Sequence, residues 1–578
     1  MGDRYAVFSS PHLSPKETRA DLIAHCRSFV QYYTKAAEEA EALQEGEVGA
    51  FRLEEHPSVK LEPACFGKEV HLPQDTPRSR PEALRTLAVL DLGSGTFRLV
   101  LFGYWPERAY WLLDELREPV ALGEGLSRGA IGEAALDRGR KALRAFADFV
   151  GALAPDEVVV LATSAVRDAH NGVEVLREAE GLGLSPRVLS GEEEARLGVL
   201  AVANALPLED ALVVDQGGGS AQVSLMRGRR FVWGEALPFG ALRLTEAFLA
   251  SDPPGKREVK ALRKEVDRRL KALPLERGLP LVGLGGNVRA VARLHRKRHR
   301  YPLDLVHAYY LPRAGVEELL EEVLSLPLEA RRELPGLQED RARTLPATLV
   351  FLEALLDRAE VPGLWVSGVG IREGVLFTRL LPPPHLLPDP RAFAVENLFL
   401  RYPFSEAHRD RVKALARSLF RGLAPLHGYG GAEERLLLEA AHLHDIGMHI
   451  GYHEHHKHGA YLVLSGPLFG FSHREQVLLA RLVRYHRRGK PEAKGYRPLL
   501  AKGDAERLKR LAVLLRLAEM LERTRTGRVR GVRVDLGERV RLFLEADGDP
   551  WVERLEAEKQ AGLFLEAFGV GLEVAWEG

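Results

Sequence analysis

Apolar runs that end in glycine mark two similar stretches of the chain. Residues 211–226, ALVVDQGGGSAQVSLM, read as a strand, a glycine turn and a second alternating strand, which is typical of a hairpin. Residues 87–102, LAVLDLGSGTFRLVLF, repeat the pattern position by position, with Asp91 on Asp215 and Thr96 on Ser220. An internal repeat of this kind predicts two similar α/β halves that face each other across a cleft.

Further strand patterns alternate with helical ones up to residue 380. Several of the strands run into glycine or polar turns, which predicts open α/β sheets with ligand-binding edges. The expected strands are 157–167, 187–189, 281–287 and 365–371, and the expected helices are 131–153, a helix reaching 180, 288–294 and 372–380.

The two ends of the chain differ from this middle part. Residues 16–45 predict one long helix, and residues 46–85 form a linker rich in Pro, Glu and Arg. After the Pro-rich segment 382–390, helical periodicity predicts an α-helical domain that includes an amphipathic helix at 406–423, and residues 528–578 read strand, strand, helix, strand. The predicted domains are 1–85, 86–206, 207–381, 391–527 and 528–578.

Composition limits the classes of partner and location. Lys plus Arg and Asp plus Glu both number 81, so polyanion binding must come from local basic clusters, and no nucleic-acid partner is expected. We expect a cytoplasmic protein without a membrane partner, because no apolar run reaches about 18 residues and no signal pattern precedes the fold. Cys26 and Cys65 lack CxxC spacing, which gives no support to a disulfide framework or a cysteine metal site.

The glycine turns are candidate phosphate sites. Consecutive backbone N–H groups can converge on an anion in such turns, and the hydroxyl after the glycines adds a donor. A Gly-rich turn alone is common as plain architecture, but its second copy favours the phosphate interpretation. The candidates are Gly93, Ser94, Gly95, Gly217, Gly218, Gly219 and Ser220, with Gly285, Gly286 and Asn287 at a predicted helix start.

An acidic helix start follows the first half. In SGEEEAR, Ser190 is a helix cap, and Glu192, Glu193 and Glu194 occupy the first turn. The helix dipole alone can explain acids there. The functional interpretation is a carboxylate at a strand edge that orients or deprotonates a water.

Six separated motifs together resemble the exopolyphosphatase/guanosine pentaphosphate phosphohydrolase family of the actin-like ATPase superfamily. They are DLGSGTFRLV, ATSAVRDAHNG, SGEEEARLG, VVDQGGGSAQ, LVGLGGNVRAVA and SGVGIREGVL, between about residues 86 and 380. The resemblance implies duplicated actin-like (ribonuclease H-like) halves and magnesium-dependent removal of a terminal phosphate. It implies that Asp91 and Asp215 bridge Mg²⁺ (or Mn²⁺), that Arg98 offsets phosphate charge, and that the acidic turn is catalytic.

Two positions depart from the family pattern. Gly95 stands where the family usually has Asn, which removes a side-chain donor from the first loop. Ser164 stands where some members carry a glutamate taken as catalytic. Glu192 therefore becomes the lead candidate for the base, with Glu194 as the alternative.

The helical domain contains its own group of potential ligands. His444-Asp445, with His408 some 35 residues earlier, is the pattern of HD-type metal phosphohydrolases, and Glu519 stands where their late Asp is expected. Exopolyphosphatases of the long type, which this region resembles, often carry an HD-like domain without a working metal site. The other interpretation is a path for a long polyanion, lined by the histidines of this domain and by Arg484, His486, Arg487, Arg488 and Lys490.

The sequence thus predicts an exopolyphosphatase that releases terminal orthophosphate from inorganic polyphosphate. Guanosine pentaphosphate is the alternative substrate. A non-catalytic alarmone or polyphosphate sensor and an actin-like kinase are alternatives of other classes. The family resemblance also implies a homodimer.

Overall fold

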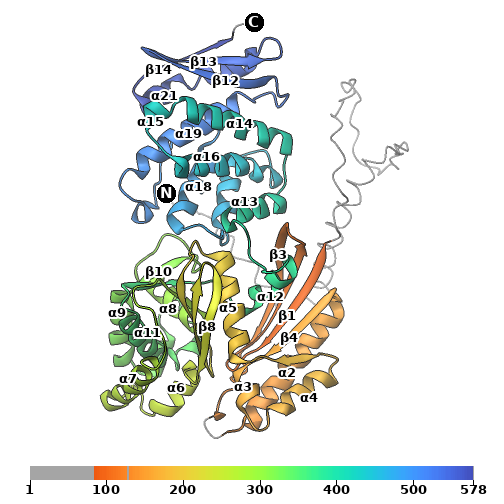
Figure 1. Cartoon of the computed structure of the whole chain (residues 1–578), viewed down its shortest axis with the longest axis vertical. Helices are drawn as coiled ribbons and strands as arrows, with labels where there is room; N and C mark the ends of the chain where they lie inside the picture. Colours follow the sequence, from red (N-terminus) through yellow and green to blue (C-terminus); the bar gives the residue numbers. More distant parts are fainter. Residues whose placement is uncertain (1–83, 127–128, 577–578) are drawn as a thin grey trace, which may run out of the picture.

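The computed structural model describes residues 84–126 and 129–576 as two α/β lobes, a helical domain and a C-terminal sheet (Figure 1). The predicted helix 16–45, nearly all of the linker 46–85 and both cysteines lie outside the described residues. The predicted domain boundaries near 206, 381–391 and 527 fall in loops between elements.

Lobe I is a five-stranded sheet in the order β3-β2-β1-β4-β5. Its glycine hairpin pairs Asp91 with Arg98 at the end of β1 and β2 next to the turn, while β4 runs parallel to β1. The expected strand at 157–167 ends earlier, because Thr163 begins a short helix. The elements are β1 (Arg85–Leu92), β2 (Phe97–Trp105), β3 (Ala109–Glu118), α2 (Glu133–Leu153), β4 (Glu157–Ala162), α3 (Ser164–Asp168), α4 (Gly172–Gly181) and β5 (Pro186–Val188).

Lobe II repeats this plan, in the order β8-β7-β6-β9-β11 with β10 added at the far edge. In both lobes three antiparallel strands are followed by parallel ones, so the predicted duplicated α/β architecture is confirmed. The strands are β6 (Ala211–Gln216), β7 (Ala221–Arg227), β8 (Arg230–Leu237), β9 (Leu281–Leu284), β10 (Tyr309–Pro312) and β11 (Gly363–Val366). The helices are α6 (Ala241–Phe248), α7 (Lys256–Leu270), α8 (Gly285–Arg298), α9 (Arg313–Ser325), α10 (Leu328–Arg332) and α11 (Leu345–Ala359).

The central strand β6 is covered on both faces. Leu212 and Val214 enter one apolar cluster, and Ala211 and Val213 enter the cluster on the other side. Alternate side chains of a strand point to opposite faces, which explains why this strand reads as a continuous apolar run. Burial on both faces fixes the strand and its polar end at Asp215.

Two helices cross between the lobes. α5 (Gly191–Ala205) leads from lobe I into lobe II, and α12 (Ile371–Leu380) returns to pack on α5 and on β1 and β2. A Cβ on Gly374 would lie 2.4 Å from the carbonyl oxygen of Leu197, so this crossing requires glycine. The close crossing fixes the position of the acidic turn at the start of α5.

The helical domain packs on lobe I through an aromatic contact. Tyr110 of β3 stacks on Phe393 and Phe469, with ring centroids 6.3 and 6.0 Å apart. Its backbone N–H also donates to Asn397 Oδ1 at 2.8 Å. The helices are α13 (Pro390–Arg401), α14 (Glu406–Gly422), α15 (Ala424–His427), α16 (Gly431–Leu443), α17 (His455–Leu464), α18 (His473–Tyr485) and α19 (Asp504–Met520).

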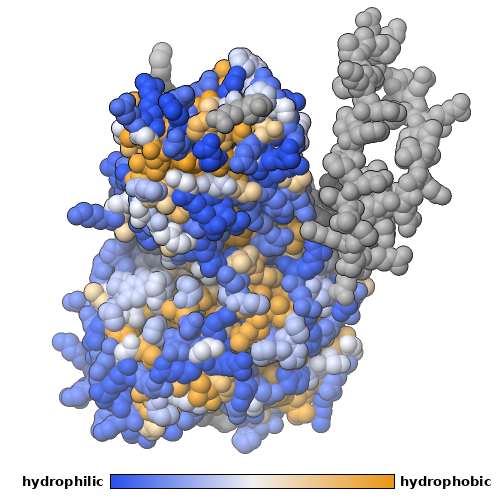
Figure 2. All heavy atoms as spheres, turned by 45° about the horizontal axis from the view of Figure 1, so that its top comes forward, coloured by the Kyte–Doolittle hydropathy of each residue, from blue (hydrophilic) through white to orange (hydrophobic). Residues whose placement is uncertain are grey.

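The C-terminal unit is a three-stranded sheet in the order β12-β13-β14 with two helices where the sequence predicted one. Apolar surface gathers at this end of the molecule (Figure 2), and four exposed side chains here are Trp551, Val552, Leu555 and Leu565. Among the described residues, no helix is long and apolar enough to cross a membrane. The elements are β12 (Val529–Leu536), β13 (Arg539–Ala546), α20 (Trp551–Glu558), α21 (Ala561–Phe568) and β14 (Gly571–Trp576).

Candidate active site

A cavity of about 120 Å³ lies where the glycine turns of the two lobes meet. The turns touch: a Cβ on Gly219 would lie 2.7 Å from the Oγ atoms of both Ser94 and Ser164. Most of the residues predicted to hold phosphate or metal come together here. The predicted residues that line the cavity are Asp91, Gly93, Ser94, Gly95, Arg98, Glu194, Asp215, Gly217, Gly218, Ser220, Gly285, Gly286 and Asn287.

Glycine is required where the backbone passes closest to the acidic groups. Gly285, at the start of α8, has φ +90°, and a Cβ there would lie 2.6 Å from Asp215 Oδ1. A Cβ on Gly218 would lie 3.0 Å from the backbone nitrogen of Gly95 in the other lobe. These glycines therefore keep the Asp215 carboxylate clear and let the two turns approach.

Three carboxyl groups face this cavity: Glu194 is buried, and Asp91 and Asp215 are partly buried. Burial raises the pKa of Asp215 to about 6, with Asp91 adding repulsion and Arg289 opposing the rise. Burial also raises the pKa of Asp91, against the effects of Arg372 and Arg98. The pKa of Glu194 rises to about 7 for the same reason, although Arg167 lowers it. Removal from water thus dominates over the nearby arginines at all three groups.

The structure corrects the choice of Glu192 as lead base. Glu192 points to solvent, with 57% of its side chain exposed, and pairs with Arg196 one helical turn later. Glu194 is the acid that lines the cavity: Arg167 donates to its Oε1, and Gln222 Nε2 donates to its Oε2 at 2.9 Å. Successive positions on a helix are about 100° apart, so Glu192 and Glu194 face different sides.

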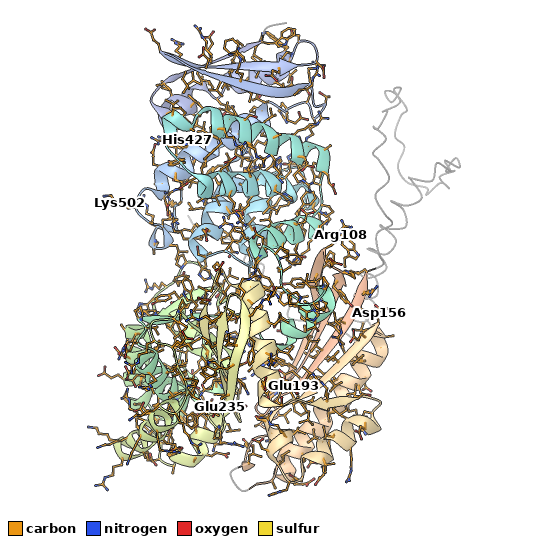
Figure 3. The ribbon with its side chains drawn as sticks, viewed as in Figure 1. Arg108, Asp156, Glu193, Glu235, His427 and Lys502 are labelled. Carbon is orange, nitrogen blue, oxygen red and sulfur yellow. The ribbon has the colours of Figure 1, made fainter. Side chains whose placement is uncertain are left out.

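Glu193 serves the helix start. It accepts from the backbone N–H of Ser190 at 2.8 Å, and the Ser190 hydroxyl accepts from its backbone N–H at 3.2 Å, which forms a capping box. Figure 3 labels Glu193 at this first turn, close to where the two lobes meet. The structural interpretation of the acidic turn therefore holds for Glu193.

Four arginines complete the lining, and the sequence singled out only Arg98. Arg289 comes from α8, Arg341 from the short 3-10 helix η2 (Glu339–Arg341) before α11, and Arg372 from α12. Burial lowers the pKa of Arg98, Arg289 and Arg341 to about 10 each. All three stay cationic at neutral pH. No local signal marks Arg341, whereas Arg289 and Arg372 lie inside two of the quoted glycine motifs.

Arg341 links the two lobes at the edge of the cavity. Its guanidinium donates to Asn287 Oδ1 of lobe II at 2.9 Å and to Thr96 Oγ1 of lobe I at 3.2 Å. Asn287 in turn donates to the backbone carbonyls of Gln216 and Gly217 at 3.2 and 3.1 Å. These contacts connect α8 to both glycine turns, so the relative position of the turns depends on Arg341.

The site fits a hard divalent cation. Mg²⁺ takes one or two carboxylates and completes its shell with water and substrate phosphates. Asp91 and Asp215 supply two partly buried carboxylates, and Gly285 leaves one Asp215 oxygen clear. Their raised pKa values are consistent with groups whose ionisation a bound cation would favour.

The position of Ser164 shows how the departure from the family pattern is accommodated. Its hydroxyl lies 2.8 Å from the Ser94 hydroxyl, and both are buried behind the first glycine turn. Ser94 Oγ also accepts from the backbone N–H of Ala165 at 3.0 Å. Ser164 therefore supports the first glycine turn through Ser94. Glu194 is the glutamate that lines the cavity.

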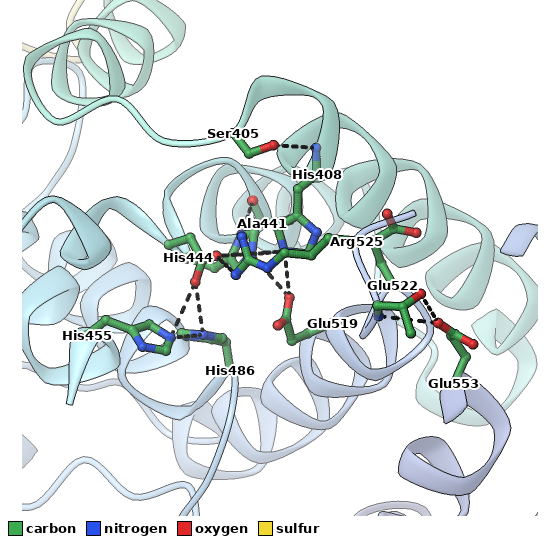
Figure 4. Close-up of polar contacts among 12 residues, drawn as sticks. Ser405, His408, Ala441, His444, His455, His486, Glu519, Glu522, Arg525 and Glu553 are labelled. Carbon is green, nitrogen blue, oxygen red and sulfur yellow. Dashed lines mark hydrogen bonds and ion pairs between the residues drawn. The ribbon is translucent and has the colours of Figure 1, made fainter. Parts of the chain in front are cut away.

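The predicted ligands of the helical domain also come together. His408, His444 and Asp445 are buried in one cluster, and Glu519 joins them with its Oε2 3.1 Å from His408 Nε2 (Figure 4). The sequence did not assign His455 a ligand role, yet its Nε2 lies 3.3 Å from Asp445 Oδ1.

The predicted polyanion path is corrected at one residue. His486 is fully buried in the same histidine cluster, so it cannot form part of an exposed path. Arg487 and Arg488 line a separate cavity of about 330 Å³ with Tyr452 and Arg523. The other two predicted residues are placed elsewhere: Arg484 lies over the ring of Tyr485, and Lys490 pairs with Glu566.

Comparisons with known proteins show what this chain is similar to. A relative from Pseudoalteromonas translucida (strain TAC 125), a guanosine-5'-triphosphate,3'-diphosphate pyrophosphatase, is 27% identical over 442 residues, 74% of this chain and 86% of the relative. Two solved structures each cover 51% of this chain. A Ppx/GppA family member from Aquifex aeolicus is 29% identical (96% of that chain, TM-score 0.45), and an exopolyphosphatase from Cytophaga hutchinsonii is 26% identical (98%, TM-score 0.48).

Family models cover most of the described chain. The model of the Ppx/GppA phosphatase family matches residues 109–382, which hold most of both lobes. The model of Ppx/GppA phosphatase domain III matches residues 391–556, which hold the helical domain. The chain therefore belongs to the Ppx/GppA phosphatase family.

Proposed function

We propose that the chain hydrolyses the terminal phosphoanhydride bond of inorganic polyphosphate in the cavity between the lobes. The observation that carries this proposal is the meeting of two glycine turns, three carboxyl groups and four arginines around one small cavity. Phosphoryl transfer needs an oriented nucleophile and neutralised phosphate oxygens more than covalent help from the protein. The cavity lining contains residues that could orient the nucleophile and residues that could neutralise the phosphate oxygens.

The glycine turns and the arginines would bind the chain end. Backbone N–H groups of the turns and the Ser220 hydroxyl can donate to the terminal phosphate. Arg98, Arg289 and Arg372 approach from β2, α8 and α12, so they surround the charge that the reaction redistributes over phosphate oxygens. Asp91 and Asp215 would hold Mg²⁺ or Mn²⁺, which supplies Lewis-acid neutralisation of the phosphates.

Glu194 would orient and deprotonate the attacking water. A carboxylate with a pKa of about 7 is suited to general-base catalysis near neutral pH. Arg167 and Gln222 fix its two oxygens, so the side chain is held in one orientation. The water oxygen would attack terminal phosphorus, the anhydride bond would break, and the shortened chain would leave as the oxyanion while orthophosphate is released.

The lining favours polyphosphate over a nucleotide. Among the described residues that line the cavity, none carries an aromatic ring on which guanine could stack. Guanosine pentaphosphate is the second candidate substrate. It is supported by the name of the relative from Pseudoalteromonas translucida, a guanosine-5'-triphosphate,3'-diphosphate pyrophosphatase.

Orthophosphate release from polyphosphate and from guanosine pentaphosphate tests the proposal. With Mg²⁺ present, we expect a higher kcat/KM for polyphosphate and no requirement for ADP. A sensor would bind either compound without releasing phosphate, whereas a kinase would release none and form ATP when ADP is added. Either result would refute the proposal, and a higher kcat/KM for guanosine pentaphosphate would reverse the substrate order.

A further inference from the structure

Five buried side chains of the helical domain converge around Asp445. On one side, His408 Nε2 and His444 Nε2 lie 3.7 and 3.8 Å from Asp445 Oδ2. On the other side, His455 Nε2 and His486 Nε2 lie 3.3 and 3.6 Å from Asp445 Oδ1. Glu519 contacts both His408 and His444, and these three residues form the first group; His455 and His486 form the second group. The carboxylate of Asp445 thus stands between two histidine pairs, one on each oxygen.

Backbone contacts fix which ring nitrogen of three histidines carries hydrogen. The Nδ1 atoms of His444, His455 and His486 lie 2.7, 2.9 and 2.8 Å from the carbonyl oxygens of Ala441, Tyr452 and Val483. A carbonyl oxygen only accepts, so each Nδ1 carries the hydrogen. In the neutral ring, Nε2 then has a free lone pair, which is the arrangement that metal-binding histidines use.

These lone pairs point at one another. His455 Nε2 and His486 Nε2 are 3.2 Å apart, and both face Asp445 Oδ1. His444 Nε2 faces Glu519 Oε2 at 3.2 Å. Lone pairs brought this close without a hydrogen or a cation between them repel. Within the described residues, Asp445 Oδ1 also has no hydrogen-bond donor.

The spacings match the size of a transition-metal site. Tetrahedral Zn²⁺ at about 2.0–2.1 Å from N and O ligands separates them by about 3.3–3.4 Å. In the first group, His408 Nε2, His444 Nε2 and Glu519 Oε2 are 3.1–3.2 Å apart. In the second, the three separations run from 3.2 to 3.6 Å. Both groups therefore have room for one ion at their centre.

We propose that the helical domain binds a pair of divalent transition-metal ions bridged by Asp445. His408, His444 and Glu519 complete the first site, and His455 and His486 complete the second. Mixed imidazole and carboxylate ligands suit Zn²⁺, Fe²⁺ or Mn²⁺. The first site has four protein ligands, while the second has three and leaves a position for water, as in catalytic rather than structural sites.

Among the described residues, the guanidinium of Arg525 is a cation in direct contact with this cluster. Its guanidinium donates to Asp445 Oδ2 at 2.5 Å. A carboxylate oxygen has two lone pairs, so Oδ2 can accept from Arg525 and ligate the first ion together. The two negative charges of Asp445 and Glu519, with Arg525 beside them, leave the bound pair with a positive excess that exogenous anions or hydroxide would balance.

Metal content of the full chain tests the pair. Protein stripped with EDTA would be loaded anaerobically with Mn²⁺, Fe²⁺ or Zn²⁺, desalted and measured by elemental analysis. We expect Asp445→Asn to hold about two ions per chain fewer than the parent, and Glu519→Gln and His486→Gln to hold about one fewer each. His453→Gln is the matched control, because His453 is an exposed histidine of the same segment and should leave the content unchanged.

Two further readouts separate metal loss from misfolding. Loading should raise the melting temperature of the parent and of His453→Gln but not of Asp445→Asn, whose circular dichroism should match the parent. The Mn²⁺-loaded parent should give the electron paramagnetic resonance signal of an exchange-coupled pair. Equal metal content in the parent and Asp445→Asn would overturn the proposal, and so would a single uncoupled ion per chain. In that case a proton on His444 Nε2, donated to Glu519 Oε2, would take the place of the metal ion in the first group.

Discussion

Replacing Glu194 by Gln, with Glu192→Gln as the matched control, separates the two candidate bases. The first substitution keeps the shape of a buried side chain but removes the basic oxygen facing the cavity. If Glu194 deprotonates water, turnover should fall by about 10²–10⁴-fold. At about 1.4 kcal/mol per tenfold, this is about 3–5 kcal/mol of transition-state stabilisation.

The substitution also has a structural cost that must be measured apart. Arg167 and Gln222 both donate to Glu194, so a Gln amide group must face one donor with its own NH₂. One lost hydrogen bond in a buried position costs about 1–3 kcal/mol of stability. Glu192→Gln removes only an exposed pair with Arg196, which contributes about 0.3–0.5 kcal/mol.

The assay is orthophosphate release at saturating polyphosphate, expressed per folded molecule after thermal melts of each variant. We expect Glu194→Gln to lose rate at temperatures where it is fully folded, while Glu192→Gln matches the parent. Polyphosphate affinity should hold or rise slightly in Glu194→Gln, because one negative charge near the polyanion has gone. Loss of rate in Glu192→Gln with retained rate in Glu194→Gln would refute the assignment.

Three more results are expected. The kcat/KM should rise as pH rises through about 7, because the raised pKa of Glu194 keeps this carboxyl group protonated and inactive below that value. If the same rise of kcat/KM with pH remains in Glu194→Gln, the titrating group is another residue. Asp215→Asn should lose activity that higher Mg²⁺ partly restores, and a defect independent of Mg²⁺ would argue against a metal role. Charge reversal at Arg487 and Arg488 should weaken binding of long polyphosphate more than of short chains, less so at high salt, whereas equal loss for both lengths would exclude a distant contact.

The repeat and most of the residues that line its cavity could be predicted because they depend on local patterns. A buried strand that ends in Asp and glycine is visible as letters, and both copies, near Asp91 and Asp215, line the cavity. The same holds for the capping box at Ser190, whose geometry follows from spacing within one helical turn.

The remaining features depend on contacts between distant segments. Whether Glu192 or Glu194 faces the cavity depends on the rotation of α5, which its crossing with α12 at Gly374 fixes. Arg341 contacts Thr96, which lies 245 residues earlier in the sequence, and no sequence motif surrounds Arg341. In the helical domain, His486 stands in a run of basic residues in the sequence, but the fold buries its side chain in the histidine cluster.

Isotope transfer from solvent tests the central claim most directly. Polyphosphate of defined length would be hydrolysed in H₂¹⁸O with Mg²⁺, and orthophosphate and the remaining chains would be analysed by mass spectrometry. We predict one ¹⁸O in each released orthophosphate, none in the remaining chains, and chains that shorten without internal fragments. Finding ¹⁸O in the remaining chains, fragments from internal cleavage, or no orthophosphate would contradict water attack on the terminal phosphate.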